Sequence, residues 1–252
     1  MAQAFIADLH LTAERPAAIA LFCAFLGSAR ERLERLYILG DLFEYWVGDD
    51  GLAEPECAPV IAALASATRA GLAVSVMHGN RDFLLGSGFA RHTGCQLLAD
   101  PHSLTLYGVP TLLSHGDALC TDDAEYQRLR ARFRDPAWQR QVLSRPLPER
   151  LEMARSLRRE SERAMSGKDE ALLDVNDDAV TALLAEHQAV QLIHGHTHKP
   201  GRYPVALDGQ RATRVVVGDW YTTSSVLTAG PRGLRLTAVA DFPGAVADVM
   251  GR

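Results

Sequence analysis

The segment Val190–His198 joins an apolar run to two histidines spaced two residues apart. On a strand or its extended exit, side chains two positions apart point to the same side. His196 and His198 are therefore placed to face a common site at the end of a predicted strand. Because imidazole is the commonest protein ligand for transition metals, we expect a metal site here. A single His-x-His pair also arises by chance, so the preceding segments must supply further evidence.

Four more polar signatures occur earlier in the chain, each directly after an apolar run that predicts a strand. They are Asp8-x-His10, Gly40-Asp41, Gly79-Asn80 and His115-Gly116. In α/β sheets, ligands bind at the carboxyl ends of strands. The ligand set is too large for one ion but suits two ions that share a bridging carboxylate and clamp the oxygens of a phosphoryl group. Carboxylate, amide and imidazole without thiolate favour Mn²⁺, Fe²⁺ or Zn²⁺.

Each of these residues alone has a simpler explanation. Asp8 fits a helix cap, and Asp41 and Asn80 fit turns. His115 fits a hydrogen-bonded histidine of the core. The combination favours the metal site, because all five signatures stand at predicted strand ends.

The segments that must position these residues alternate between strands and helices. The predicted strands are Ala4–Ala7, Leu36–Leu39, Ala73–Met77, Ser103–Tyr107, Thr111–Ser114, Val190–His194, Arg214–Val217, Ser225–Ala229 and Leu234–Val239. The predicted helices are Pro16–Arg32, Glu54–Ala70 and Asn176–Glu186. This order predicts an α/β sandwich whose early strands are parallel. The last ten residues show no informative pattern.

Residues 123–170 interrupt this alternation with a helical pattern that contains Pro136, Pro146 and Pro148. From Tyr126 to Glu170 the chain carries 12 Lys/Arg against 7 Asp/Glu, an excess of five in a protein that is acidic overall. An unstructured loop of this length is uncommon. We therefore expect a single domain over residues 1–252, with 123–170 as a helical insertion or lid.

The insertion also has an amphipathic pattern. Apolar and basic residues alternate at roughly helical spacing: Leu147, Leu151, Met153, Ala154, Leu157 and Met165 beside Arg155, Arg158, Arg159 and Arg163. Such a pattern predicts contact with an anionic membrane surface. It fits equally well with apolar packing against the sandwich and a solvated arginine face. The aromatic residues Phe43, Tyr45 and Trp46 are similarly open to two interpretations, as pocket lining or as core.

Composition limits the class of protein. The chain has 252 residues, of which 47% are hydrophobic and 23% charged, and its net charge of −5 argues against nucleic acid as a partner. No apolar run reaches the ~18–20 residues of a membrane-spanning helix, and the N-terminus has no signal-peptide pattern, so we expect a cytoplasmic protein. The four cysteines are scattered and are expected to be reduced.

The five signatures, in this order, resemble those of the calcineurin-like metallophosphoesterases from Phe5 to about Val217. This resemblance implies a four-layer α-β-β-α sandwich. Three longer segments resemble more closely the UDP-2,3-diacylglucosamine pyrophosphatases of lipid A biosynthesis. They read L-Y-I-L-G-D-L-F-E-x-W-x-G-D-D, H-G-N-R-D-F-L-L-G and H-G-D-x-L-C-T-D-D. This closer resemblance implies that a two-metal-activated water hydrolyses this lipid-linked nucleotide to UMP and 2,3-diacylglucosamine 1-phosphate. We expect a monomer that associates peripherally with the cytoplasmic face of the inner membrane.

The resemblance also implies which residues act. It implies one Mn²⁺ ion held by Asp8, His10, Asp41 and His198. It implies a second Mn²⁺ ion held by Asp41, Asn80, His115 and His196, with Asp41 as the bridge. The catalytic group would comprise Asp41, Asn80, Arg81 and His115.

Arg81 supports the substrate class on physical grounds. Many members of the superfamily have a histidine at this place, which protonates an alkoxide leaving group. Arginine has a pKa above ~12 and cannot act as a general acid, but its fork of donors binds phosphate oxygens. A phosphate monoester has a second pKa near ~6 and leaves without a proton, so a phosphoric anhydride fits this site better than an alkyl phosphate. The alternative interpretation is that Arg81 is only a surface arginine near the site.

The family's substrate contacts map onto a further set of residues. They are Asn80, Arg81, Asp123, Tyr126, Arg158, Ser161, Met165, Lys168 and His196. Some members have an asparagine where this chain has Met165, which cannot make the same hydrogen bond. Lys168 is one of only two lysines and suits a phosphate or sugar oxygen as a flexible point charge.

Other functions remain compatible with the same fold. A cyclic-nucleotide phosphodiesterase or a dinucleotide polyphosphatase would share the metal site, but the insertion and Arg81 argue against both. A catalytically inactive scaffold is disfavoured because every expected ligand is present. A nuclease is disfavoured by the acidic net charge, although the insertion is basic.

Overall fold

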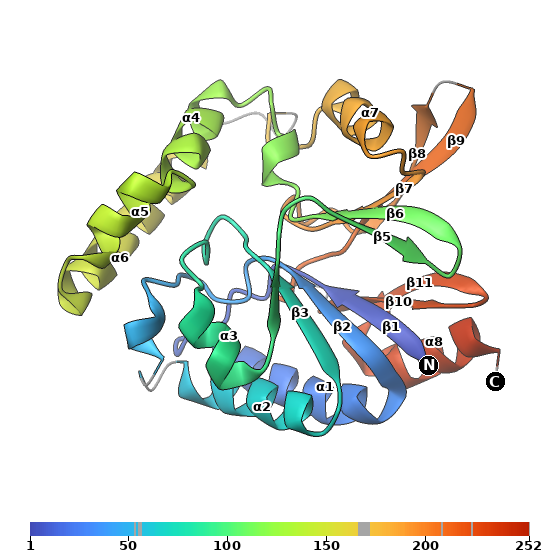
Figure 1. Ribbon diagram of the computed structural model, residues 1–252, viewed down its shortest axis with the longest axis horizontal. Coiled ribbons are helices and arrows are strands. Elements are labelled where there is room, and N and C mark those ends of the chain that lie inside the picture. The colour runs from blue at the N-terminus through green and yellow to red at the C-terminus, as the bar shows by residue number, and fades with distance from the viewer. Residues whose placement is uncertain (53, 55–56, 166–171, 208, 223, 252) are drawn as a thin grey trace.

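Two mixed β-sheets form the centre of the molecule (Figure 1). The computed structural model describes residues 1–52, 54, 57–165, 172–207, 209–222 and 224–251. The six-stranded sheet has the order β11 (Gly233–Ala238), β10 (Ser225–Gly230), β1 (Ala2–Ile6), β2 (Leu33–Leu39), β3 (Ala73–Met77) and β4 (Gln96–Leu98). The five-stranded sheet has the order β5 (His102–Leu106), β6 (Val109–Ser114), β7 (Gln191–His194), β9 (Gln210–Val216) and β8 (Gly201–Leu207).

The strands that precede the polar signatures are parallel within each sheet. β1, β2, β3 and β4 run parallel in the larger sheet, and β6, β7 and β9 run parallel in the smaller one. Their carboxyl ends therefore lie at one edge of each sheet. The two edges meet, because the His196 amide after β7 donates to the Asp8 carboxylate after β1, and the His115 ring after β6 hydrogen-bonds to the Leu39 carbonyl of β2.

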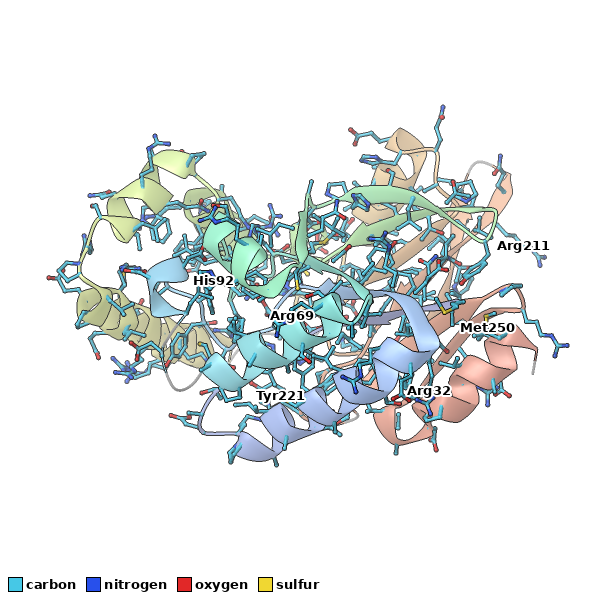
Figure 2. The ribbon with its side chains drawn as sticks, turned by 60° about the horizontal axis from the view of Figure 1, so that its bottom comes forward. Arg32, Arg69, His92, Arg211, Tyr221 and Met250 are labelled. Atoms are coloured by element: carbon cyan, nitrogen blue, oxygen red, sulfur yellow. The ribbon has the colours of Figure 1, made fainter. Side chains whose placement is uncertain are left out.

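Alternating side chains of these strands divide the interior into three apolar layers. Ile6 and Ile38 face the helices α1 (Pro16–Arg32), α2 (Ala58–Arg69) and α8 (Phe242–Met250). Leu39 and Ile193 lie between the two sheets. Leu192 belongs to the third layer, where the smaller sheet packs against α7 (Asp177–Glu186). The predicted four-layer α-β-β-α sandwich is therefore confirmed, and Figure 2 shows its layer of α1, α2 and α8 from the outer side.

Two of the three aromatic residues that follow Asp41 belong to the core, whereas Tyr45 is partly exposed. Phe43 and Trp46 are buried and pack against Phe89 of the short helix α3 (Ser87–Thr93). Asp49 fixes this region, because its carboxylate accepts from the amides of Gly86 and Gly88 at 3.0 and 2.7 Å. The loop after β2 is thus held rigidly beside the site.

Three helices project from the sandwich on one side: α4 (Ala124–Phe133), α5 (Pro136–Leu143) and α6 (Leu147–Met165) (Figure 1). Asp123 and Asp135 cap the first two, each by accepting an amide hydrogen of the first turn. Arg150 of α6 is buried and anchors this helix to the loop after β2, where it binds the Asp50 carboxylate and the Val47 carbonyl. None of the helices in the described ranges is both long and apolar enough to span a bilayer.

The sequence pattern does not predict several of the observed elements or their exact bounds. The half-exposed edge strand β8 contains Pro204, which weakens a strand prediction. The three-residue strand β4 is too short for its period to be visible. Helix α8 has only nine residues, and it is stabilised where Phe242, Ala245 and Val249 are buried against its neighbours. Helix α2 begins at Ala58, four residues later than predicted.

Candidate metal centre

Seven polar side chains meet where the carboxyl ends of the parallel strands face each other. They follow β1, β2, β3, β6 and β7 and comprise Asp8, His10, Asp41, Asn80, His115, His196 and His198. Asp8, His10 and His198 form one group whose ligand atoms lie within 4.8 Å of one another. Asp8, Asp41 and His115 form a second such group. The structure thus brings together all seven residues that the sequence singled out as metal ligands.

The first group contains buried polar atoms that lack hydrogen bonds. Asp8 Oδ1 and both ring nitrogens of His10 have no hydrogen-bond partner among the described residues. Asp8 Oδ1 lies 3.7 Å from His198 Nε2, and His10 Nε2 lies 3.6 Å from Asp41 Oδ2, distances that are too long for hydrogen bonds. Buried polar atoms are rarely left unsatisfied. A cation among these four side chains would satisfy Asp8 Oδ1 and His10 Nε2.

The second group surrounds the side-chain oxygen of Asn80. This oxygen lies 3.0 Å from His115 Nε2 and 3.0 Å from His196 Nδ1. Asp41 Oδ1 lies 3.8 Å from His115 Nε2, while Asp41 Oδ2 faces His10 in the first group. The two oxygens of one carboxylate therefore face two different histidines, an arrangement that suits a bridging ligand.

The loops that carry these residues have an unusual backbone. Among the described residues, eight that are not glycine have a positive φ, and five of these belong to the seven residues above: Asp8, His10, Asp41, His196 and His198. This conformation costs about 1–3 kcal/mol for each such residue and persists only where the surroundings impose it. Here the amides of Asp8 and His10 donate to the carbonyls of Gly40 and Asp41 at 3.2 and 2.9 Å. Hydrogen bonds between the loops therefore hold the backbone in place.

The electrostatics of the cluster favour bound cations. Burial opposes a charge on His115, but the carboxylates of Asp41, Asp117 and Asp8 outweigh it and raise its pKa to about 9. Burial likewise disfavours the Asp8 carboxylate, but the nearby imidazoles of His198, His115 and His10 lower its pKa to about 2. Negative charge is thus concentrated where water is excluded. Burial and the neighbouring His115 lower the pKa of His196 to about 4, which leaves it neutral, as a ligand must be.

Four predicted substrate contacts lie around the cluster. The Arg81 amide donates to Asp41 Oδ1 at 2.8 Å, and its side-chain Nε is buried with no hydrogen-bond partner among the described residues. The Tyr126 ring stacks on His196 with centroids 5.9 Å apart. Asp123 accepts from the Tyr126 amide at 3.1 Å and thereby caps α4. Arg158 forms an ion pair with Glu44.

The structure describes only part of the remaining predicted substrate contacts. Ser161 is half-buried on α6. The Met165 side chain and Lys168 lie outside the described residues, so their predicted roles stay predictions.

The sequence reasoning missed several acidic residues of the site. Asp117 is buried, and its Oδ2 accepts from Tyr126 Oη at 3.0 Å and from Arg130 Nε at 2.9 Å. Asp219 lies 3.8 Å from His198 Nδ1. Glu44 lies 3.3 Å from His10 Nδ1, and although burial raises its pKa, its contacts with His10 and other neighbours lower the pKa to about 2. All three follow strand ends, as the seven predicted ligands do, so the same local signal was present in the sequence.

The two-sheet fold and the cluster of seven residues agree with the calcineurin-like metallophosphoesterase class that the sequence motifs predict. No family model matches the chain. Curated relatives named UDP-2,3-diacylglucosamine hydrolase include proteins from Hahella chejuensis (48% identical, covering 86% of this chain and 88% of the relative) and Pseudomonas aeruginosa (45%, covering 96% and 100%). The chain therefore belongs to the UDP-2,3-diacylglucosamine hydrolase family.

Solved structures are similar at much lower identity. A dimetal phosphatase from Danio rerio is 13% identical, covers 95% of this chain and 99% of its own, and has a TM-score of 0.49. A Vps29 variant from Entamoeba histolytica is 16% identical, covers 94% and 90%, and has a TM-score of 0.45.

We predict that Gly79→Ala disrupts the cluster. A Cβ at this position would lie 2.0 Å from Asp41 Oδ1 and 2.3 Å from the Asp41 amide nitrogen, so the carboxylate must move. We expect the affinity for Mn²⁺ to fall about 10- to 100-fold. Titration calorimetry on metal-free protein measures this. Gly27→Ala is the control, since a Cβ there meets nothing within 4 Å, and it should bind Mn²⁺ normally. Unchanged binding by Gly79→Ala would contradict the prediction.

Proposed function

We propose that this protein hydrolyses the pyrophosphate bond of UDP-2,3-diacylglucosamine, a step of lipid A biosynthesis. The products are UMP and 2,3-diacylglucosamine 1-phosphate. The observation that carries the proposal is the cluster of seven ligands beside Arg81, in a chain whose curated relatives are named for this activity. The intact ligand set argues against an inactive scaffold.

The proposal includes two Mn²⁺ ions. Asp8, His10, Asp41 and His198 would hold the first, and Asp41, Asn80, His115 and His196 would hold the second. When bound, such a pair of ions supplies Lewis-acid stabilisation of phosphoryl oxygens and a more acidic water. The unpartnered atoms of Asp8 and His10 support this assignment, and so does the orientation of the two Asp41 oxygens.

Arg81 binds the charged oxygens of the pyrophosphate. Its buried Nε lacks a hydrogen-bond partner among the described residues and is therefore available to an anion. The guanidinium stays protonated, so it stabilises the charge that develops on the leaving phosphate without donating a proton. The leaving groups on both sides of the anhydride are phosphate monoesters, which need none.

Tyr126 orients the substrate beside His196. Burial and the nearby Asp117 carboxylate raise the pKa of Tyr126 well above its usual value, so its hydroxyl remains a donor. That hydroxyl donates to Asp117 Oδ2, which holds the ring against the imidazole. Asp117 and Arg130 thus fix one wall of the site, while Arg158, Ser161, Met165, Lys168 and Asp123 are proposed to contact the sugar and lipid.

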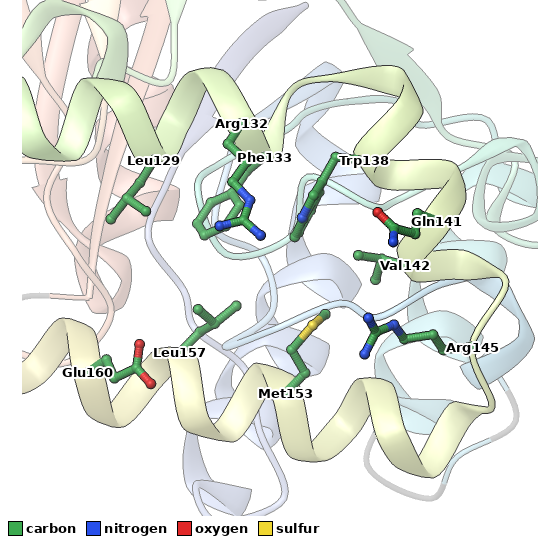
Figure 3. Close-up of a pocket in the computed structure, with 10 residues that line it drawn as sticks. All are labelled: Leu129, Arg132, Phe133, Trp138, Gln141, Val142, Arg145, Met153, Leu157 and Glu160. Atoms are coloured by element: carbon green, nitrogen blue, oxygen red, sulfur yellow. The ribbon is translucent and has the colours of Figure 1, made fainter.

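Residues 123–170 act in this proposal as a lid that binds the acyl chains. A cavity of about 350 Å³ lies between α4, α5 and α6. Figure 3 shows apolar side chains that point toward one another across it, and these are Leu129, Phe133, Trp138, Val142, Met153 and Leu157. Pockets of this size with apolar linings are typical ligand sites. The cavity is therefore the structural observation that supports a substrate with hydrocarbon chains.

We further propose that the lid helices meet the cytoplasmic face of the inner membrane and that the protein is a cytoplasmic, peripherally associated monomer. Leu129 and Leu143 are each 43% exposed on these helices. Exposed arginines surround them, including Arg128, Arg132, Arg140 and Arg145. Apolar and basic groups on one surface suit anionic lipid.

The decisive experiment measures UMP release from UDP-2,3-diacylglucosamine by the purified protein. We expect the activity to require Mn²⁺, to disappear on chelation, and to fall at least ~100-fold in Asp41→Ala, which lacks the proposed bridge. UDP-N-acetylglucosamine is the unacylated control and should be turned over far more slowly. Activity that survives both chelation and Asp41→Ala contradicts the metal mechanism. Equal turnover of the two substrates contradicts the lipid specificity alone.

Replacement of Arg81 by lysine tests whether catalysis needs only the positive charge of this side chain or also its planar geometry. Lysine keeps the positive charge but loses the planar fork, so we expect kcat/KM to fall about 10- to 100-fold. The control is Arg91→Lys, because Arg91 is exposed on α3 and donates to Ser87 on the same helix. Steady-state kinetics on both variants measures the difference. The role of Arg81 would be refuted by two variants with equal, near-normal rates.

Filling the lid cavity should change the preference for acyl chains. Leu157→Trp adds bulk to the cavity wall, so kcat/KM should fall more for substrates with long acyl chains than for those with short ones. The ratio of the two values for the variant and for the parent protein gives the result. Leu143→Trp serves as control, since Leu143 is 43% exposed and does not line the cavity. An equal loss for both substrates would argue against acyl binding here.

A further inference from the structure

Glu44 occupies a junction between the metal centre and the helices that project beside it. It lies three residues after Asp41 and is buried, with 9% of its surface exposed. The proposed function assigns no role to Glu44. Its two carboxylate oxygens nevertheless face different parts of the molecule.

One oxygen faces the metal centre. Glu44 Oε2 lies 3.3 Å from His10 Nδ1, on the side of the ring opposite the Nε2 atom that faces Asp41. Metal-bound histidines are commonly oriented by a carboxylate at their second nitrogen. The same Oε2 accepts a hydrogen bond from Tyr221 Oη at 2.8 Å, and Arg15 lies 3.6 Å over the Tyr221 ring. The position of Oε2 is therefore fixed from outside as well.

The other oxygen faces helix α6. Arg158 Nε lies 2.5 Å from Glu44 Oε1, and the arginine side chain is about one third exposed at 32%. Arg158 is one of the residues proposed to contact substrate, and Ser161 lies one turn further along the same helix. A single carboxylate thus joins the histidine of the first metal group to the helix that carries substrate contacts.

We propose that Glu44 is a positioning residue that couples metal binding at His10 to the placement of helix α6. An ion at His10 fixes the imidazole, the imidazole fixes Glu44, and Glu44 holds Arg158. By thermodynamic linkage the coupling acts in both directions, so a well-placed α6 also strengthens metal binding. The inference rests on the proposed metal centre, and it predicts that the metal-free protein holds this part of α6 less firmly.

Replacement by glutamine tests the two contacts of Glu44 separately. The amide carbonyl of Glu44→Gln can still face His10 Nδ1 and accept from Tyr221, while its NH₂ group turns donors toward the donors of Arg158. Glu44→Ala removes both contacts, and Arg158→Ala removes the contact with α6 alone. Arg159→Ala is the matched control on the same helix, because its guanidinium pairs with exposed Glu152 on the surface.

Two measurements on full-length protein read out the coupling. Titration calorimetry gives the dissociation constant for Mn²⁺, and hydrogen exchange with and without Mn²⁺ gives the protection of the amides of residues 155–161. Amides near Arg150 are an internal reference, since Arg150 is anchored separately to Asp50. Exchange in α1 reports whether each variant is folded.

In the parent protein and in Arg159→Ala, we expect Mn²⁺ to slow exchange of residues 155–161 about fivefold or more. Glu44→Gln and Arg158→Ala should lose this effect, and by linkage their Mn²⁺ dissociation constants should rise by a similar factor, about fivefold. Glu44→Ala should lose the effect and bind Mn²⁺ about 10- to 100-fold more weakly.

The inference is overturned if Mn²⁺ binds the parent protein but leaves exchange of residues 155–161 unchanged, or if Glu44→Gln retains the full effect. Absence of Mn²⁺ binding by the parent protein would overturn the metal centre as well, so the two failures are distinguishable. If Glu44→Ala does not fold, Glu44→Gln and Arg158→Ala still decide the outcome.

Discussion

The buried carboxylates of Asp8 and Asp41 impose the constraint on which the rest of the structure depends. Burial of an ionised group costs several kcal/mol unless charges and hydrogen bonds compensate it. Imidazoles and loop amides compensate in part, as the 2.8 Å hydrogen bonds from the His196 and Arg81 amides show. Atoms of Asp8 and His10 still lack partners, and cations are the groups that complete such a site.

The architecture supplies the rigidity that this cluster needs. The left-handed backbone of its loops is costly, and loop residues Leu9 and Leu42 offset part of the cost because they are buried in the core. The apolar layer between the sheets adds rigidity, because Leu39, Met77 and Ile193 are buried one or two residues before three of the five signatures. Strand pairing therefore stabilises a conformation that the loops alone would not hold.

The arginines of the projecting helices serve more than one purpose. Arg130 binds Asp117, Arg134 donates to the Gly79 carbonyl at 3.0 Å, and Arg150 binds Asp50. These residues tie the helices to the loops of the site. Arg155 and Arg159, in contrast, are exposed. Some arginines of these helices therefore anchor them to the site, and others face solvent. Helical periodicity in the sequence does not distinguish the two groups.

The sequence by itself determined the sandwich and the seven residues of the cluster, because apolar strands and the polar signatures that end them are local patterns. It missed β8 and α8, whose stability depends on tertiary contacts. It also missed Glu44, Asp117 and Asp219, although each follows a strand end. Only the tertiary structure decided that the oxygens of Asp41 face two histidines and that Glu44 lies between His10 and Arg158. The physical reason is that such contacts join side chains from strands and helices far apart in the chain, and local spacing carries no information about their partners.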